Sequence, residues 1–545
     1  MAKMTGGQAV VESLKLHGVD TVFGIISVHT LDLYDALFDN QDSLRFIGGR
    51  HEHGCGFMAD GYSRATGKPG VLLTSTGPGA ADSVGALGEA YFSSSAVLEI
   101  TTNVEQEFLD GGRLVTHETK DQPGMFRAIT DWNATIQQVE SIPDHLVEAF
   151  QRFKTKRPRP IALEIPTDLL GQEADVEVLG PRTPDTPQGD PVMVQRALET
   201  LLQAKRPVIF VGEEVQSLGG ADDVVRLAEL LGAPVVTGDG AKGTFPEDHP
   251  LSLGQALGRR IWGDNPLQEW LGTCDVAVVL GSALSYRTTL GVGLKLPETL
   301  IHVLMDGEII GKNYATTVPI QGESRAVVRQ WLDSIGDQDV YKGDTYKAEI
   351  EAFRKQIYQS LKDQWGNELR TFEAIRAVTP RDTIFAMDPT IAANRASRCL
   401  PIYGPRTYMH PHGWSGLGFA FPASLGAKVG KPDCPVVCVT GDGGFQYNLQ
   451  ELATAAQYDI HPIVLMFNDN AWGVLKKYQE DRFNGRLMAT DLVNPDFVKL
   501  FESYGFGGTK VSSLDELTRA LESAIAGGRT HLVEVQIPDG IGAFR

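Results

Sequence analysis

The chain has 545 residues, which typical domain sizes divide into about three domains, and its apolar content of 42% is ordinary for a globular protein with a large core. The formal net charge of −20 argues against nucleic acid or an anionic membrane surface as a partner, and no uninterrupted apolar run reaches the roughly 18 residues that span a membrane. The first residues lack the apolar core of a signal peptide and the five cysteines are scattered, so we expect a cytoplasmic protein.

Residues 1–180 alternate helical and extended patterns, which predicts a first domain with a doubly wound parallel sheet. The apolar runs and spacings predict strands at 21–26, 45–47, 71–74, 96–101 and 157–166, and helices at 6–17, 31–37, 54–66 and 80–92.

Three polar residues of this domain are candidates for chemistry. Glu52 follows a strand and opens a helix, where the helix dipole alone favours a carboxylate. His29 follows the first strand, a position where a lone histidine is more often a surface or capping residue. Gln122 lies within residues 117–132, a segment that has the character of a binding loop.

A proline-rich linker at 180–191 separates the first domain from a second one, which we place at 190–335. Its strands at 207–212, 234–237, 276–281 and 300–306 predict a six-stranded Rossmann-like domain. It has no GxGxxG motif, and the carboxylates of Gly212-Glu213-Glu214 would repel a phosphate, so we expect no nucleotide and no FAD there. Residues 336–372 are highly charged and have a helical pattern, typical of a connector over the surface.

The third domain, at 365–545, carries the strongest motif. Buried strands are predicted at 383–388, 435–440 and 462–467, with a helix at 448–458 between the last two. Asp442 and Asp469 therefore follow two strands of one βαβ unit, at the sheet edge where open α/β sheets bind ligands. Carboxylates beside a glycine-rich turn suit Mg²⁺ or Ca²⁺ holding a diphosphate, although acidic residues after strands often only cap helices. Thr390 has the same two interpretations, a donor to the diphosphate or a helix cap.

Two stretches of sequence resemble one enzyme family. GDG at 441–443, followed after 24 residues by Asn468-Asp469, resembles the signature of thiamine diphosphate (ThDP) enzymes, and RHEHGCGFMADGYSRATGKPGV at 50–71 closely resembles the acetolactate synthase and benzaldehyde lyase group. The resemblance implies bound ThDP and Mg²⁺, with the metal held by Asp442, Asp469 and the carbonyl of Ala471. The family more often has asparagine where this chain has Asp469.

The same resemblance implies roles for other residues. Glu52 is expected to hydrogen-bond the pyrimidine ring and to activate the cofactor, while His29 and Gln122 are expected at its reacting end as polar, proton-shuttling groups. Leu417, in His410–Phe419, is expected to hold the cofactor in a bent shape, and residues 476–494 are expected to cover the site. The other cofactor contacts that we expect are Gly77, Pro78, Thr390, Gly416, Gly441, Gly443, Gly444, Trp472, Gly473 and Val474.

These patterns predict a ThDP- and Mg²⁺-dependent 2-oxo-acid decarboxylase that also joins carbon chains, similar to acetolactate synthase. A benzaldehyde-lyase-like cleavage of 2-hydroxyketones and a catalytically silent nucleotide-binding homologue are the alternatives. The resemblance further implies a homodimer or homotetramer whose site lies at a subunit interface.

Overall fold

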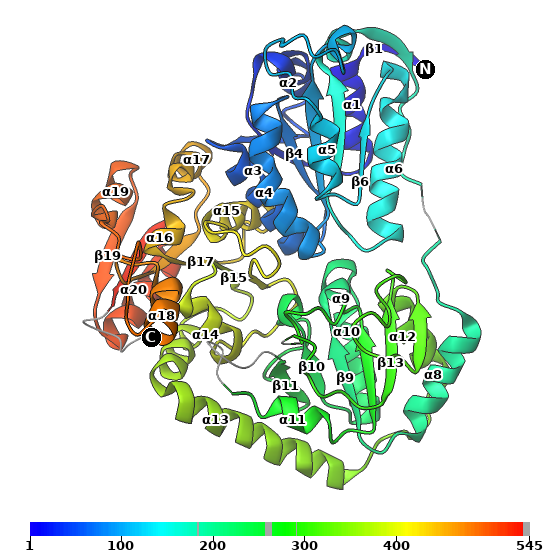
Figure 1. Ribbon diagram of the computed structural model, residues 1–545, viewed down its shortest axis with the longest axis vertical. Coiled ribbons are helices and arrows are strands. Elements are labelled where there is room, and N and C mark those ends of the chain that lie inside the picture. Colours follow the sequence, from blue (N-terminus) through cyan, green and yellow to red (C-terminus); the bar gives the residue numbers. More distant parts are fainter. Residues whose placement is uncertain (183–184, 257–263, 290, 538–545) are drawn as a thin grey trace.

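The computed structural model describes residues 1–182, 185–256, 264–289 and 291–537. It contains three six-stranded parallel sheets with helices on both faces, one after another along the chain (Figure 1). This confirms the predicted fold class, while the domain boundaries at 180, 190, 335 and 365 stay predictions. None of the helices in the described part is both long and apolar enough to cross a membrane.

The first sheet has the strand order β3-β2-β4-β5-β7-β6. Its central strands β4 and β5 are buried throughout, as expected for a parallel sheet covered on both faces. The strands are β2 (Thr21–Gly24), β3 (Arg45–Gly48), β4 (Gly70–Thr74), β5 (Val97–Asn103), β6 (Trp132–Thr135) and β7 (Ile161–Pro166). The main helices are α1 (Gly6–Leu16), α2 (Leu31–Phe38), α3 (Glu52–Thr66), α4 (Pro78–Phe92), α5 (Gln122–Arg127) and α6 (Ile142–Thr155). A small antiparallel ribbon of β1 (Ala2–Thr5) and β8 (Glu173–Val176) was not expected from the sequence.

The second sheet has the order β11-β10-β9-β12-β13-β14, which is 3-2-1-4-5-6 when its strands are counted along the chain. That is the order of dinucleotide-binding folds, and it confirms the predicted six-stranded Rossmann-like sheet. Its strands are β9 (Pro207–Val211), β10 (Val235–Thr237), β11 (Ser252–Gln255), β12 (Val276–Leu280), β13 (Thr299–Leu304) and β14 (Val318–Gln321). The helices include α8 (Pro191–Gln203), α9 (Glu213–Leu218), α10 (Ala221–Leu231), α11 (Leu267–Leu271) and α12 (Ser324–Ile335).

The third sheet has the order β16-β15-β17-β18-β20-β19. Counted along the chain this is 2-1-3-4-6-5, which is also the order of the first sheet. Its strands are β15 (Ile384–Met387), β16 (Tyr408–Met409), β17 (Val436–Gly441), β18 (Ile463–Asn468), β19 (Gly507–Val511) and β20 (His531–Gln536). Its helices include α14 (Ile391–Cys399), α15 (Ala420–Gly430), α16 (Asp442–Phe445), α17 (Leu452–Tyr458), α18 (Gly473–Arg482), α19 (Phe497–Ser503) and α20 (Leu514–Gly527). The long helix α13 (Asp344–Ala377), kinked at Trp365, forms the predicted connector.

The N- and C-terminal domains share one hydrophobic core, built around α3 and α15, which lie side by side (Figure 1). Glycines make this close approach possible, because a Cβ atom at Gly61 or Gly426 would collide with the backbone of the opposing helix. Phe57 of α3 packs edge-on against Phe419, with 5.2 Å between ring centroids. The two domains are therefore held rigidly against each other within the chain.

Candidate functional site

The two carboxylates predicted from the sequence lie together at the C-terminal edge of the third sheet. Asp442 follows β17 and is 1% exposed, and its Oδ2 accepts a hydrogen bond of 2.7 Å from Nδ2 of Asn494. Asp469 follows β18, the neighbouring strand, and its Oδ1 accepts from the backbone N–H of Ala471 at 3.2 Å. A cavity of about 260 Å³ is lined by both residues.

The electrostatics of this pair fit a divalent cation. Burial raises the pKa of Asp442, and burial together with repulsion from Asp442 raises the pKa of Asp469. Two carboxylates facing each other with little counter-charge are costly to ionise, and a hard cation between them removes that cost. The donor set of two carboxylates and nearby backbone carbonyls is the kind that Mg²⁺ or Ca²⁺ accepts.

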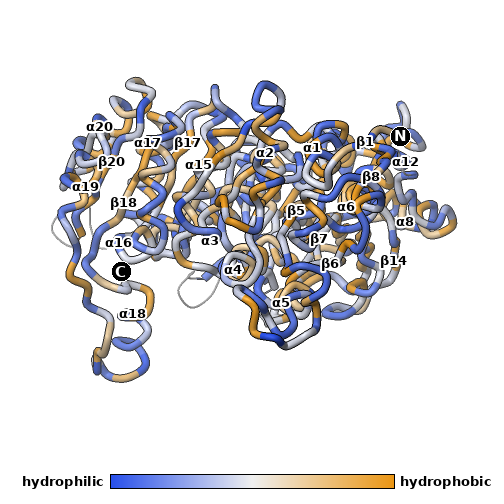
Figure 2. The backbone as a smooth tube through the Cα atoms, turned by 90° about the horizontal axis from the view of Figure 1, so that it is seen from above, coloured by the Kyte–Doolittle hydropathy of each residue, from blue (hydrophilic) through white to orange (hydrophobic). Residues whose placement is uncertain are grey.

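The turns around the pair are fixed by contacts within the protein. A Cβ atom at Gly443 would lie 2.5 Å from the ring of Trp472, so glycine is required there for Trp472 to pack against the turn. The N–H of Trp472 donates to the carbonyl of Thr490 at 2.7 Å, and the N–H of Leu492 donates to the carbonyl of Asn470 at 2.8 Å. Residues 490–494 thus fold back over the carboxylate pair, while α18 stands away from the body of the molecule (Figure 2).

Most cofactor contacts predicted for this domain line the same cavity. They are Thr390, Leu417, Gly441, Asp442, Gly443, Gly444, Asp469, Ala471, Trp472, Gly473 and Val474, and Leu475 joins them. Gly416 lies beside this wall, between Ser415 and Leu417, which both line it. Thr390 also caps α14, since its Oγ1 accepts from the N–H of Ala393 at 3.1 Å.

Asp388 was not singled out in the sequence as a site residue, although it directly precedes Pro389-Thr390. It is fully buried, accepts 2.5 Å and 2.9 Å hydrogen bonds from Oγ1 of Thr440 and the N–H of Ala420, and burial raises its pKa to about 6. Asp388 therefore fixes the start of α15, directly after the loop that carries Leu417.

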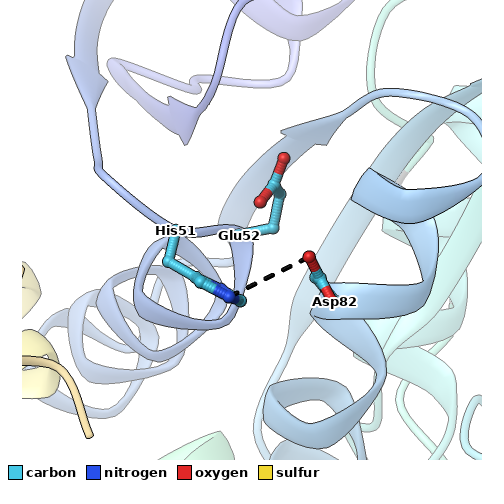
Figure 3. A group of neighbouring side chains, drawn as sticks. All are labelled: His51, Glu52 and Asp82. Atoms are coloured by element: carbon cyan, nitrogen blue, oxygen red, sulfur yellow. Dashed lines mark ion pairs between the residues drawn. The ribbon is translucent and has the colours of Figure 1, made fainter.

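Glu52 lies at the corresponding edge of the first sheet, where α3 begins. A Cβ atom at Gly79 would be 3.2 Å from its Oε1, so the carboxylate borders the predicted Gly77-Pro78-Gly79 turn. Figure 3 shows it beside His51 and Asp82, which form an ion pair of 3.9 Å.

Glu52 does not face the Asp442–Asp469 cavity of its own chain, because the described lining of that cavity comes from the C-terminal domain alone. Arg50, two residues before the start of α3, is instead fixed by hydrogen bonds to another part of the C-terminal domain. The backbone N–H of Arg50 donates to the carboxylate of Glu451 at 3.1 Å, and its guanidinium donates to Oε1 of Gln457 at 2.6 Å.

Gln122 is 1% exposed, and its amide is fully engaged within the N-terminal domain. Oε1 accepts from Oγ1 of Thr76 at 3.0 Å and from the N–H of Gly77 at 2.8 Å. Nε2 donates to the carbonyl of Thr102 and to Oε1 of Glu164, both at 2.8 Å. In this arrangement Gln122 holds the Gly77 turn; its predicted role in moving protons stays a prediction.

His29 lies in a short 3₁₀ turn after β2, and sequence reasoning missed its neighbour, His117. The two imidazole rings have centroids 4.7 Å apart, and Nδ1 of each is buried without a hydrogen-bond partner. Burial, with His117 close by, lowers the pKa of His29. The backbone of His117 also touches the Gly77 turn. The signal was available, because His117 begins the segment 117–132 that was identified as a binding loop.

Glu89 of α4 is a second residue that sequence reasoning missed. Its carboxylate is fully buried and accepts hydrogen bonds of 3.0 Å from the backbone N–H groups of both Trp414 and Ser415. The guanidinium of Arg64 balances the charge of Glu89, with 3.6 Å between Nη2 and Oε1. A glutamate in the middle of a helix carries no sequence signal for such a contact with another domain. Glu89 fixes the backbone two residues before Leu417.

In the middle domain, Glu214 fills the crevice where nucleotides bind to folds of this order. It is 1% exposed, accepts from the N–H of Met305 at 3.0 Å and from Oγ of Ser324 at 3.1 Å, and burial raises its pKa to about 7. A buried carboxylate at the strand ends is unfavourable for a phosphate, which supports the prediction of no nucleotide without testing it.

The chain thus has two matching sheet edges, one with the carboxylates Asp442 and Asp469 and one with Glu52 beside His51 and Asp82, on an α/β fold. The comparisons with known proteins agree. Models of the N-terminal, central and C-terminal domains of thiamine pyrophosphate enzymes match residues 4–125, 194–331 and 391–535. The chain therefore belongs to the thiamine pyrophosphate (ThDP) enzyme family, as its motifs predicted.

Two curated relatives align over nearly the whole chain. One is a probable acetolactate synthase large subunit of Methanocaldococcus jannaschii, 32% identical over 98% of this chain and 92% of the relative. The other is a probable 2-ketoarginine decarboxylase of Pseudomonas aeruginosa, 32% identical over 98% and 94%. A ThDP-dependent 4-hydroxybenzoylformate decarboxylase of Rhodococcus jostii RHA1 has the same fold, with a TM-score of 0.81 at 24% identity over 98% of this chain and 99% of that one.

Proposed function

We propose that this protein is a Mg²⁺-dependent ThDP enzyme that decarboxylates a 2-oxo acid and can join the product to a second carbonyl compound. The observation that carries the proposal is the pair of Asp442, which is buried, and Asp469, which is partly exposed, on neighbouring strand ends, combined with Glu52 at the matching edge of the N-terminal sheet. The relatives named as an acetolactate synthase and a 2-ketoarginine decarboxylase support a 2-oxo acid as substrate.

The carboxylates of Asp442 and Asp469, with the carbonyl of Ala471, would hold Mg²⁺ and through it the diphosphate. Gly441 and Gly443, which line the cavity without side chains, would let the diphosphate approach the backbone, and Leu417 in the cavity wall would support the cofactor. Bound ThDP supplies a thiazolium carbon that adds to the substrate carbonyl and accepts the electron pair that decarboxylation releases.

Glu52 would share a proton with a pyrimidine nitrogen, and the Gly77-Pro78 turn that it borders would contact that ring. His29, together with His117, offers imidazole nitrogens without protein partners for proton exchange with substrate. Gln122 would keep the Gly77 turn in place. Because Glu52 is not among the described residues that line the cavity of its own chain, we propose that a second copy of the chain supplies it, so that a homodimer is the smallest active unit.

A substrate screen tests the reaction. The holoenzyme, reconstituted with ThDP and Mg²⁺, is incubated with pyruvate, longer 2-oxo acids, benzoylformate and benzoin, and products are identified by mass spectrometry. Release of CO₂ with an aldehyde or a 2-hydroxyketone product supports the proposal. Cleavage of benzoin alone would replace it with a 2-hydroxyketone lyase, and cofactor binding without any turnover would leave a catalytically silent homologue.

A further inference from the structure

A second cavity, of about 350 Å³, lies where the three domains meet. Its wall combines the C-terminal end of α3 and residues 93–96 from the first domain, residues 216–218 and 239–240 from the second, and residues 406–412 from the third. In the described part of the chain it shares no lining residue with the cavity at Asp442. It is therefore separate from the proposed cofactor site.

Polar atoms without partners are concentrated in this wall. His410 is 6% exposed, and both of its ring nitrogens lack a hydrogen-bond partner; the same holds for Oγ of Ser95 and Oη of Tyr408, whose residues are each 4% exposed. Burial lowers the pKa of His410 to about 3, so its neutral ring offers one donor and one acceptor. Buried polar groups are normally satisfied, and a group of orphans around one cavity indicates a ligand with several polar atoms.

Two positive charges of this wall have no ion pair with a carboxylate among the described residues: Lys154, which is exposed, and the more deeply placed Arg406. Its guanidinium donates to the carbonyl of Ser217 at 2.9 Å and to that of Arg64 at 3.5 Å, but it forms no ion pair with any carboxylate among the described residues. The other charges nearby are paired: Arg64 binds Asp60, and Asp239 binds Arg287. A largely buried guanidinium balanced only by carbonyl dipoles favours an anion.

We propose that this cavity is a second ligand site, which binds a small organic anion through a carboxylate or phosphate group paired with Arg406. His410, Ser95 and Tyr408 hydrogen-bond to its polar atoms, and Phe150 offers its ring to an apolar part of the ligand. Ordered water alone would satisfy the orphan atoms, but it would not neutralise Arg406.

The site is coupled to the proposed cofactor site through one loop. Residues 410–412 are followed, after Gly413, by Trp414 and Ser415, whose N–H groups donate to Glu89, and two residues later by Leu417. Nη1 of Arg64 also donates to the carbonyl of His410, at 3.0 Å. An anion that binds His410 therefore acts on the backbone that positions Leu417.

Isothermal titration of the ThDP- and Mg²⁺-loaded enzyme with inorganic phosphate and, separately, with benzoate tests the proposal. The variant Arg406→Asn removes the charge and suits the positive backbone angle at this position, where φ is 62°. Arg519→Asn, on the exposed surface of α20, is the matched control. We expect at least one anion to bind the wild type and the control equally, and to bind Arg406→Asn at least about tenfold more weakly.

The identity of the anion that binds shows which group pairs with Arg406. Binding of phosphate alone indicates a phosphorylated ligand, and binding of benzoate alone indicates a carboxylate. Should Arg406→Asn fail to fold, His410→Phe, which fills space without offering a polar atom, must show the same loss. The proposal is overturned if neither anion binds, if binding is the same in the variants and the wild type, or if crystals grown with the anion that binds hold only water in this cavity.

Discussion

The first and third sheets have the same strand order, and each carries a pair of acidic residues on, or directly after, neighbouring strands, yet the two pairs are satisfied differently. In the first sheet, Glu99 accepts from the hydroxyls of Thr74 and Ser83, and Glu164 accepts from Gln122 and Thr135. In the third, Asp442 accepts a hydrogen bond from Asn494, while Asp469 accepts one from the adjacent backbone N–H of Ala471 and lies beside the like charge of Asp442.

The difference shows how one topology gives two functions. Neutral donors surround the N-terminal acids, so they need no metal and serve to fix the sheet. The C-terminal acids keep oxygen lone pairs directed at a cavity, so they suit a cation. The N-terminal edge contributes instead Glu52, His29 and His117, groups suited to proton transfer.

The largest expected effect comes from breaking the C-terminal pair. Asp442→Asn removes one charge from the metal site, and we expect the affinity for ThDP in Mg²⁺ to fall by at least about 100-fold, with loss of activity. Fluorescence titration with ThDP measures it. Asp333→Asn, an exposed change on α12, is the control; unaltered affinity in Asp442→Asn would reject the metal role.

The next effect concerns the N-terminal edge alone. Glu52→Gln keeps the shape of the side chain but removes the proton-sharing carboxylate, so we expect turnover to fall by about 10²- to 10⁴-fold while ThDP still binds. NMR exchange of the C2 proton of bound ThDP locates the defect. Exchange at the wild-type rate would show that Glu52 has another role.

A smaller effect is expected at the contact between the two domains. Glu89→Gln weakens the charge-assisted bonds to Trp414 and Ser415, which should destabilise the loop by about 1–3 kcal/mol and lower kcat more than it changes the affinity for ThDP. Steady-state kinetics at saturating ThDP measures the effect on kcat, and thermal unfolding measures the effect on stability. A lower Tm with unchanged kcat would make Glu89 purely structural.

The smallest effect on activity, none at all, is expected for a group that makes only the stability of the fold depend on pH. Burial raises the pKa of Glu99 from 4.5 to about 8, so the folded chain keeps a proton that the unfolded chain loses. Its stabilising contribution is complete below pH 4.5 and is lost as the pH rises to 8, by no more than about 5 kcal/mol.

Thermal unfolding of wild type and Glu99→Gln between pH 5 and 8 measures this contribution. The wild type should lose more stability than the variant across this range. Glu308→Gln, an exposed change, should follow the wild type. Parallel pH profiles for wild type and Glu99→Gln would contradict the protonated state of Glu99.

The sequence predicted much of the fold because the central strands of parallel sheets are continuous apolar runs, as at β4, β5, β17 and β18. It missed edge strands such as β6, β16 and β19, whose short or partly exposed sequences carry little signal. Most residues that line the cavity at Asp442 and Asp469 were predicted from sequence motifs. Glu89 and the orphan atoms around His410 did not, because they depend on which surfaces the three domains bring together.

Among the cysteines, Cys438 of β17 is buried, while Cys434, which precedes that strand, is half-buried. The predicted helix at 448–458 begins with a 3₁₀ turn at Leu449–Glu451 before α17. Residues 183–184 of the predicted linker lie outside the described residues.

The most direct test of a shared active site is to combine two inactive variants in one dimer. It shows whether Glu52 of one chain and Asp442 of its partner belong to the same site. Glu52→Gln and Asp442→Asn chains carrying different tags are co-expressed, and the mixed dimer is purified and assayed with ThDP and Mg²⁺. If Glu52 of one chain serves Asp442 of its partner, one of the two sites is intact and the mixed dimer should show about half of the wild-type turnover. A mixed dimer as inactive as each variant alone would contradict a site shared between subunits.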